Sequence, residues 1–172
     1  MNDLPKVMAD STSEARVNAD PDMEMAPDDL QALQPLDDDA KAPVDEAAKA
    51  LALAIAEAAD DRKAGNITIL QTGDISYLAD YFVIVTGFSN VQVRAIANSI
   101  EDAVEEQFER LPLRNEGASE GRWVVKDYGE VIAHIFMPDD RDYYDLEAFW
   151  GHAERIEFVP TSAVSLSSSP LK

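Results

Sequence analysis

The segment Tyr81–Thr86 constrains the fold most, because all six of its residues are apolar, aromatic or β-branched. A continuous run of this kind predicts a strand that is buried on both faces and lies in the middle of a sheet. Gly87 ends the run, and Ser89 with Gln92 three residues later has the spacing of a helix capping box. An amphipathic helix should follow and stop at Pro112. Its apolar stripe would consist of Val93, Ile96, Ala97, Ile100, Ala103, Val104, Phe108 and Leu111.

Further helices and strands are expected on both sides of this unit. Apolar residues at helical spacing between Pro43 and Gly65 predict a first helix, which Gly65 should terminate. The other predicted elements are strands at 67–70, 123–126, 131–137 and 156–158, a loop through 116–117 and a short helix over about 144–150. A four-residue turn at 127–130 would make two of these strands an antiparallel pair. The predicted fold is therefore α/β, with a mixed β-sheet flanked by helices.

Composition divides the chain into three parts. Residues 1–45 carry 12 acidic and 3 basic side chains with five prolines among them, which predicts an acidic, disordered extension over 1–43. Residues 44–158 hold the periodic patterns and form the predicted α/β domain. Four serines and a proline between 165 and 170 predict that 159–172 is a disordered, serine-rich tail.

Net charge narrows the classes of partner. With 14 Lys and Arg against 34 Asp and Glu, the chain has a formal charge of −20, which argues against direct nucleic-acid recognition and against binding to anionic membranes. A basic partner would be attracted instead. The absence of cysteine excludes disulfides and thiolate metal sites, and no apolar run reaches membrane-spanning length. Because no secretory signal is present either, the expected location is the cytoplasm.

Motifs for catalysis are missing. A strand–glycine–helix junction also begins the nucleotidyltransferase fold, but metal-dependent nucleotidyl transfer needs a pair of carboxylates. Such a pair would be expected on the strand that starts at Trp123, where Lys126 stands in place of an acid. His134 alternates with apolar neighbours, which predicts a partly buried, hydrogen-bonded ring and not a metal ligand. Ser89 is explained by its capping role. We therefore expect neither an enzyme nor a bound cofactor or metal.

Aromatic and charged residues gather in two places that suit a protein-binding surface. Trp123, Lys126 and Tyr128 surround the predicted hairpin, and a second cluster lies at 143–150. Within that second cluster, apolar residues are expected to anchor the last helix to the sheet: Leu146, Phe149 and Trp150. Arg141 next to this cluster is expected to form a surface ion pair that contributes little to stability.

Several segments, taken in order, resemble one known family. They read ADYFVIVTGFS at 79–89, GRWVVKDYGEV at 121–131 and RDYYDLE at 141–147, with matching residues also at 92–97, 116–117, 134–136 and Trp150. These are signatures of the Iojap-related family of ribosomal silencing factors, RsfS. The resemblance covers about residues 45–158, which is nearly the whole predicted domain.

This resemblance implies a binding protein with a nucleotidyltransferase-like fold that lacks the catalytic carboxylates. It implies binding to the large ribosomal subunit through the L-fourteen protein, a steric block of small-subunit joining, repression of translation, and self-association as a homodimer. Two alternatives stay open: a large-subunit assembly factor that uses the same docking surface, and a residual nucleotide-binding enzyme at the Gly87–Ser89 helix start. Carried over to this sequence, the partner-binding residues are Trp123, Lys126, Asp127, Tyr128, Tyr143, Tyr144, Asp145, Glu147 and Trp150.

Overall fold

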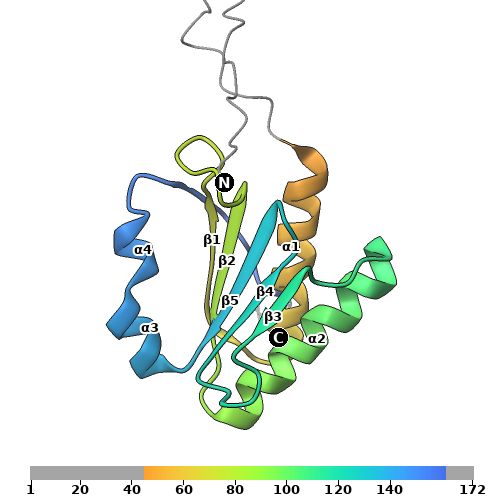
Figure 1. Cartoon of the computed structure of the whole chain (residues 1–172), viewed down its shortest axis with the longest axis vertical. Helices are drawn as coiled ribbons and strands as arrows, with labels where there is room; N and C mark the ends of the chain where they lie inside the picture. The colour runs from red at the N-terminus through yellow and green to blue at the C-terminus, as the bar shows by residue number, and fades with distance from the viewer. Residues whose placement is uncertain (1–44, 162–172) are drawn as a thin grey trace, which may run out of the picture. The chain divides into compact units, whose positions relative to one another are not determined.

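The computed structural model describes residues 45–161, so the predicted acidic extension and most of the predicted serine-rich tail lie outside the described range. The described part is a mixed sheet with two long helices on one face and two short helices on the other (Figure 1). Its elements are α1 (Glu46–Asp61), β1 (Gly65–Gln71), β2 (Tyr81–Thr86), α2 (Asn90–Phe108), β3 (Arg114–Glu116), β4 (Trp123–Asp127), β5 (Val131–Phe136), α3 (Pro138–Tyr144), α4 (Leu146–Phe149) and β6 (Glu154–Ile156).

The six strands are ordered β3-β4-β5-β2-β1-β6. β2 and β5 run parallel, whereas the other four neighbouring pairs are antiparallel. β2 lies inside the sheet and all six of its residues are buried, which confirms the prediction made from its continuous apolar sequence. The predicted α/β class with a mixed sheet is confirmed as well.

Side-chain capping begins both long helices. Asp45 accepts a hydrogen bond from the Ala47 amide (2.9 Å) at the start of α1, and Ser89 accepts one from the Gln92 amide (3.1 Å) at the start of α2. The Gln92 side chain accepts a hydrogen bond from the Phe88 amide (2.8 Å). In a standard capping box the donor would be the N-cap residue Ser89, so the second bond of the predicted motif is shifted by one residue. The expected terminator Gly65 instead opens β1, since α1 already ends at Asp61.

The end of α2 differs from the prediction because tertiary contacts redirect the chain before Pro112. Glu109 takes a left-handed conformation (φ 54°), and its amide donates to the Glu105 carbonyl. Arg110 then forms an ion pair with Glu130 and donates to the Tyr128 carbonyl at the β4–β5 turn. The helix therefore stops at Phe108, and the apolar stripe does not continue to Leu111.

The C-terminal region and the sheet edges show the largest differences. β3 is too short and too polar to give a strand signal, and it exists because it pairs with β4. Pro138 directly follows β5 and occupies the first turn of α3. The single helix predicted over 144–150 is wrong, because the left-handed Asp145 separates α3 from α4. β6 begins two residues before its predicted position and pairs with β1.

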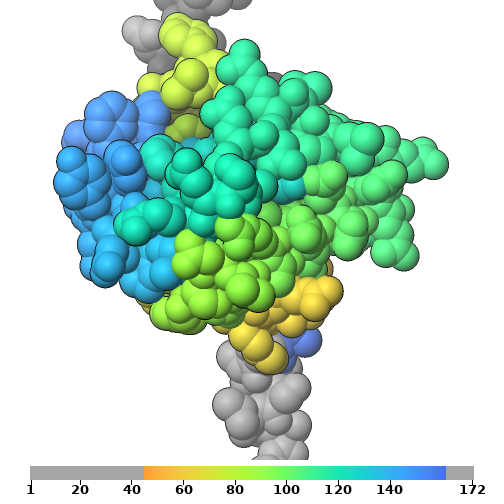
Figure 2. Space-filling model, turned by 60° about the horizontal axis from the view of Figure 1, so that its bottom comes forward, coloured from red at the N-terminus to blue at the C-terminus, as the bar shows by residue number. Residues whose placement is uncertain are grey.

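Two cores lie on opposite faces of the sheet. Alternating residues of β2, β4 and β5 pack with α1 and α2 on the first face. On the second face a smaller core forms from Leu70, Ala79, Phe82, Ile84 and Phe136, with Leu146 and Trp150 packed on it. Figure 2 shows the blue segment of α3 and α4 and the green helix α2 on opposite sides of the blue-green β3–β4 region. None of the helices between residues 45 and 161 combines the length and apolar character needed to cross a membrane.

Candidate functional site

Strand alternation brings most of the predicted aromatic residues to the second face of the sheet. Trp123 lies opposite Phe136 in the β4–β5 register, and Phe82 of β2 lies beside Ile132 of β5. Because residues that are directly opposite in a register point to the same face, these side chains form one surface. The short helices α3 and α4 cover part of it.

The aromatic rings on this face contact one another. The Trp123 ring stacks on Phe136 with centroids 4.8 Å apart, and Tyr144 packs on the same indole at 4.6 Å. Phe82 meets Trp150 edge to face at 5.4 Å. Such pairs stabilise a structure beyond the effect of area burial alone. Leu146 and Trp150 both pack on the second core and therefore anchor the last helix to the sheet, as predicted.

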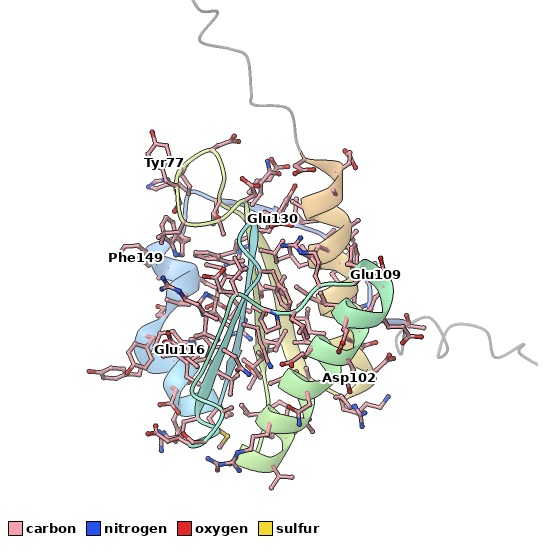
Figure 3. The ribbon with its side chains drawn as sticks, turned by 45° about the vertical axis from the view of Figure 1, so that its right-hand side comes forward. Tyr77, Asp102, Glu109, Glu116, Glu130 and Phe149 are labelled. Carbon is pink, nitrogen blue, oxygen red and sulfur yellow. The ribbon has the colours of Figure 1, made fainter. Side chains whose placement is uncertain are left out.

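An apolar pocket of about 380 Å³ remains open on this face, and we call it the aromatic groove. Its lining consists of Leu78, Phe82, Trp123, Val125, Ile132, His134, Tyr144, Leu146, Phe149 and Trp150. Phe149 is 74% exposed, so the prediction that it anchors the helix is wrong. Leu78 and Tyr143 are also exposed, and Tyr77 and Phe149 project outward on the same side of the domain (Figure 3). Large apolar side chains gathered at a surface are typical of an interaction site.

His134 forms the polar floor of the groove. The residue is 8% exposed, so it is buried more deeply than predicted, and Nδ1 accepts the expected hydrogen bond, from the Trp123 indole N–H (3.2 Å). Nε2 is buried without a hydrogen-bond partner among the described residues. Burial lowers the pKa of His134 to about 4, and the nearby Asp127 carboxylate opposes this effect. The ring is therefore neutral at physiological pH.

This lowered pKa predicts a loss of stability in mild acid. Between about pH 6.5 and pH 4 the unfolded chain binds a proton on His134 that the folded protein excludes, so the free energy of unfolding should fall as pH decreases. The contribution is about 1 kcal/mol per pH unit. Denaturant unfolding of the wild type and of His134→Gln across this range would measure it. The expected difference is a shallower curve for the variant, and parallel curves would contradict the assignment.

Two of the predicted partner-binding residues lie inside the domain. Lys126 is 1% exposed and Tyr128 is fully buried, and Tyr128 belongs to the core beneath α1 and α2. Lys126 forms an ion pair with Glu101 of α2, and burial raises the pKa of Tyr128 above its usual range. Neither side chain is therefore available to a partner at the surface of the domain. The sequence already indicated that Lys126 does not lie beside Trp123. The two residues are three positions apart on one strand, so their side chains point to opposite faces of the sheet.

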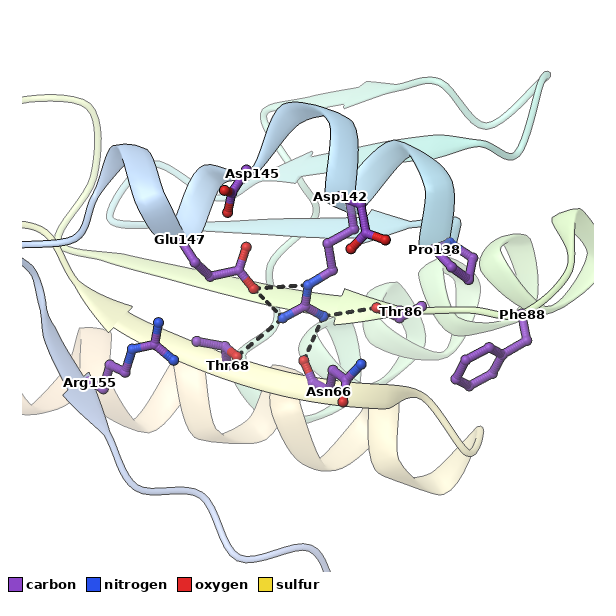
Figure 4. Close-up of a pocket in the computed structure, with 10 residues that line it drawn as sticks. Asn66, Thr68, Thr86, Phe88, Pro138, Asp142, Asp145, Glu147 and Arg155 are labelled. Carbon is purple, nitrogen blue, oxygen red and sulfur yellow. Dashed lines mark hydrogen bonds and ion pairs between the residues drawn. The ribbon is translucent and has the colours of Figure 1, made fainter.

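Arg141 is not the surface ion pair that was predicted. Its guanidinium is nearly buried and pairs with Glu147, and it also donates to the Asn66 carbonyl (2.6 Å), Thr86 Oγ1 (2.9 Å) and Thr68 Oγ1 (3.2 Å) (Figure 4). The Arg141 side chain therefore connects α3 and α4 to both β1 and β2. Glu147 serves this network, and so its carboxylate is occupied within the domain.

Replacing Arg141 with lysine should test this network. A lysine keeps the charge but cannot donate from a planar fork to acceptors on three elements. We expect a loss of about 1–3 kcal/mol in the free energy of unfolding, since the buried Thr86 and the partly buried Thr68 and Glu147 would lose donors. Thermal or denaturant unfolding would measure it, with Arg155→Lys at an exposed position of β6 as the control. Equal stability of the two variants would contradict the role of Arg141.

The other predicted contact residues lie at or near the surface. Asp145 is exposed and also caps α4 by accepting a hydrogen bond from the Ala148 amide (3.3 Å). Asp127 is half-buried and accepts one from the Gly129 amide (2.8 Å), which fixes the β4–β5 turn. Tyr143 is 81% exposed, whereas Tyr144 is about half exposed. Of the predicted residues, Trp123, Tyr144 and Trp150 line the aromatic groove, and Tyr143 packs edge to face on Tyr144 with ring centroids 5.0 Å apart. Asp127 and Asp145 are not among the lining residues.

A second, polar pocket of about 540 Å³ adjoins Arg141 (Figure 4). Arg141 and Glu147 satisfy each other there, and Phe88 and Arg155 lie at its opposite ends. Between residues 45 and 161 no group of three or more His, Asp or Glu side chains is placed to hold a metal ion. The aromatic groove is therefore the better candidate for a functional site.

Fold and site together define a class: a mixed α/β domain that exposes an aromatic groove. The family model for the ribosomal silencing factor during starvation, RsfS, matches residues 45–170. The chain therefore belongs to the RsfS family of ribosomal silencing factors, which are regulatory proteins of translation.

Individual relatives agree with this assignment. The ribosomal silencing factor RsfS of Bacillus subtilis is 45% identical over 98 residues, covering 57% of this chain and 82% of the relative. The chloroplast protein Iojap of Zea mays is 36% identical over 108 residues, covering 63% of this chain and 46% of the relative. Among solved structures, a Chromobacterium violaceum protein superposes with a TM-score of 0.56 at 35% identity, covering 71% of this chain and 98% of that one.

Proposed function

We propose that this protein binds the large ribosomal subunit through its L-fourteen protein and sterically blocks joining of the small subunit, so that translation is repressed. Family membership supports a role in silencing ribosomes. The observation that carries the proposal is the aromatic groove, where Leu78 and Phe149 are exposed beside packed aromatic rings and the exposed Tyr143 packs on Tyr144. Exposed aromatic anchors beside a pocket are typical of protein–protein hot spots.

Charge supports a basic protein partner. The chain carries −20 overall, and Asp142 and Asp145 are exposed near Tyr143. Ribosomal proteins are usually basic, so opposite charges would accelerate the encounter. The same negative charge would repel the phosphates of bare RNA. We therefore assign affinity to the aromatic groove and steering to the acidic residues around it, and we expect neither catalysis nor a cofactor.

Sedimentation with isolated large subunits tests the proposal directly. The full chain should move with the large subunit, and small subunits added afterwards should fail to form whole ribosomes. A large subunit that lacks the L-fourteen protein should not retain the chain. Binding without a block on joining would favour the assembly-factor alternative, since assembly needs only the docking step. Absence of binding would contradict both functions.

Two further properties belong to the same proposal. We propose that the protein acts in the cytoplasm, where translating ribosomes are found. We also propose that it self-associates as a homodimer. The charge of −20 on each copy opposes close approach, and a dimer should therefore be weak and should tighten when salt screens the long-range repulsion.

A further inference from the structure

A second opening lies beside the aromatic groove, and we call it the loop pocket. It has a volume of about 320 Å³ and is lined by residues of the loop over 72–80, which joins β1 to β2, and by Gly129 and Glu130 of the β4–β5 turn. Leu78 lines both the loop pocket and the aromatic groove, so the two openings share a wall. A segment that fills the groove can therefore place a neighbouring side chain in the loop pocket.

Hydrogen bonds hold this loop in place although its tip is exposed. The amides of Thr72 and Gly73 donate to the Asp80 carbonyl (2.7 and 3.1 Å), and Thr72 Oγ1 donates to the Ala79 carbonyl (2.8 Å). The Asp80 amide donates to the Glu130 carbonyl (2.8 Å), which connects the loop to the β4–β5 turn. Both walls of the loop pocket are thus positioned before a partner arrives, and preorganisation of this kind lowers the entropic cost of binding.

The charge of the loop pocket favours a cation. Of the residues that line it, Asp80 and Glu130 are acidic and none is basic. Glu130 is neutralised by its ion pair with Arg110, whereas Asp80 is partly buried and has no ion-pair partner between residues 45 and 161. A carboxylate that is partly removed from water attracts a cation more strongly than a fully hydrated one. The pocket is therefore suited to a lysine or arginine side chain.

Tyr77 adds a second feature that suits a cation. Its side chain is fully exposed and lines the same pocket. The face of an aromatic ring attracts an ammonium or guanidinium group. The aromatic groove has no aspartate, glutamate, lysine or arginine in its lining, so the groove alone does not distinguish a basic segment from a neutral one. The loop pocket supplies that distinction.

We propose that the loop pocket binds a lysine or arginine side chain of the same partner segment whose apolar side chain occupies the aromatic groove. This inference rests on the proposed function, in which the partner is a basic ribosomal protein, and adds the chemistry of the segment that is recognised: an apolar residue close to a basic one. A neutral side chain in the loop pocket would cover the Asp80 carboxylate without pairing it, and that cost disfavours segments that lack the cation.

Replacing Asp80 with asparagine in the full-length protein tests this subsite, because the change removes the charge and keeps the size of the side chain. We expect the dissociation constant for purified large subunits to rise roughly tenfold. The dissociation rate should carry most of this change, since a charge in direct contact acts on the bound complex, whereas a steering charge acts on the association rate. Asp80→Lys should weaken binding further, because it places like charges together. Association and displacement of labelled protein would measure both rates.

Asp74→Asn is the matched control, because Asp74 is an exposed residue of the same loop that does not line the pocket. It should change the dissociation rate by less than about twofold. Tyr77→Leu and Tyr77→Phe form a second pair that does not depend on Asp80. Leucine keeps the apolar bulk but has no ring face, so Tyr77→Leu should raise the dissociation constant about threefold, whereas Tyr77→Phe should bind like the wild type. Thermal unfolding of each variant would check that the fold is retained.

The outcomes separate this inference from the proposed function. A folded Asp80→Asn variant that binds like the wild type, or an Asp74→Asn variant that weakens binding equally, would overturn the cation subsite while the wild type still binds the large subunit. If Asp80→Asn unfolds, the second pair decides, and equal binding by Tyr77→Leu and Tyr77→Phe would overturn the subsite in the same way. A wild-type chain that does not bind large subunits would contradict the proposed function and, with it, this inference.

Discussion

Replacing Glu101 with alanine is expected to lower the free energy of unfolding by about 3 kcal/mol, because the change leaves the Lys126 ammonium buried without its partner. Only 2% of the Lys126 side chain is exposed, so little water can reach its ammonium group when the carboxylate is removed. Glu101 itself is partly exposed, and we therefore expect an effect near the lower end of the range for broken buried pairs. Denaturant unfolding of the purified variant would measure it.

Two further variants isolate the buried charge as the cause. Asp102→Ala changes the next residue of α2, which is exposed, and should alter stability by less than about 0.5 kcal/mol. Adding Lys126→Met to Glu101→Ala removes the unpaired charge, and it should restore most of the lost stability because a buried pair can often be exchanged for apolar side chains. A double variant as unstable as Glu101→Ala would show that the ion pair is not the reason.

Replacing Phe149 and Tyr143 with alanine is expected to weaken binding to the large subunit by about 3 kcal/mol, or roughly a hundredfold in the dissociation constant. Both side chains are mostly exposed, so their removal should leave folding nearly unchanged. Tyr144 is a poorer probe, because it packs on the Trp123 indole and its removal would also disturb the fold. Titration of labelled protein against purified large subunits would give the constants.

Phe88→Ala provides a matched control for this loss. Phe88 is an exposed aromatic residue that lines the polar pocket and not the aromatic groove. Its replacement should leave binding unchanged if the groove is the contact surface. If the Phe149 and Tyr143 variant binds as well as the wild type while Phe88→Ala does not, the contact surface lies at the polar pocket instead.

The sequence by itself determined the central elements of this domain. A strand buried on both faces must be apolar at every position, and an amphipathic helix must repeat at three-and-four spacing, so β2 and α2 leave direct local signals. The helix cap at Ser89 and the antiparallel pairing of β4 with β5 are local in the same sense. The apolar neighbours of His134 on its strand correctly predicted that it points toward the inside, although its burial is more complete than expected.

Only the tertiary structure decided which charged and aromatic residues face solvent. Lys126, Glu147 and Arg141 look like surface residues in sequence, but each is satisfied by partners from distant segments. Phe149 looks like a core residue and is exposed, because the left-handed turn at Asp145 sets the orientation of α4. Local patterns report the period of an element, whereas the pairing of buried charges and the covering of a face depend on contacts between elements far apart in the chain. The physical reason is that burial of a charge becomes favourable only when a partner is present, and the chain folds that partner into place.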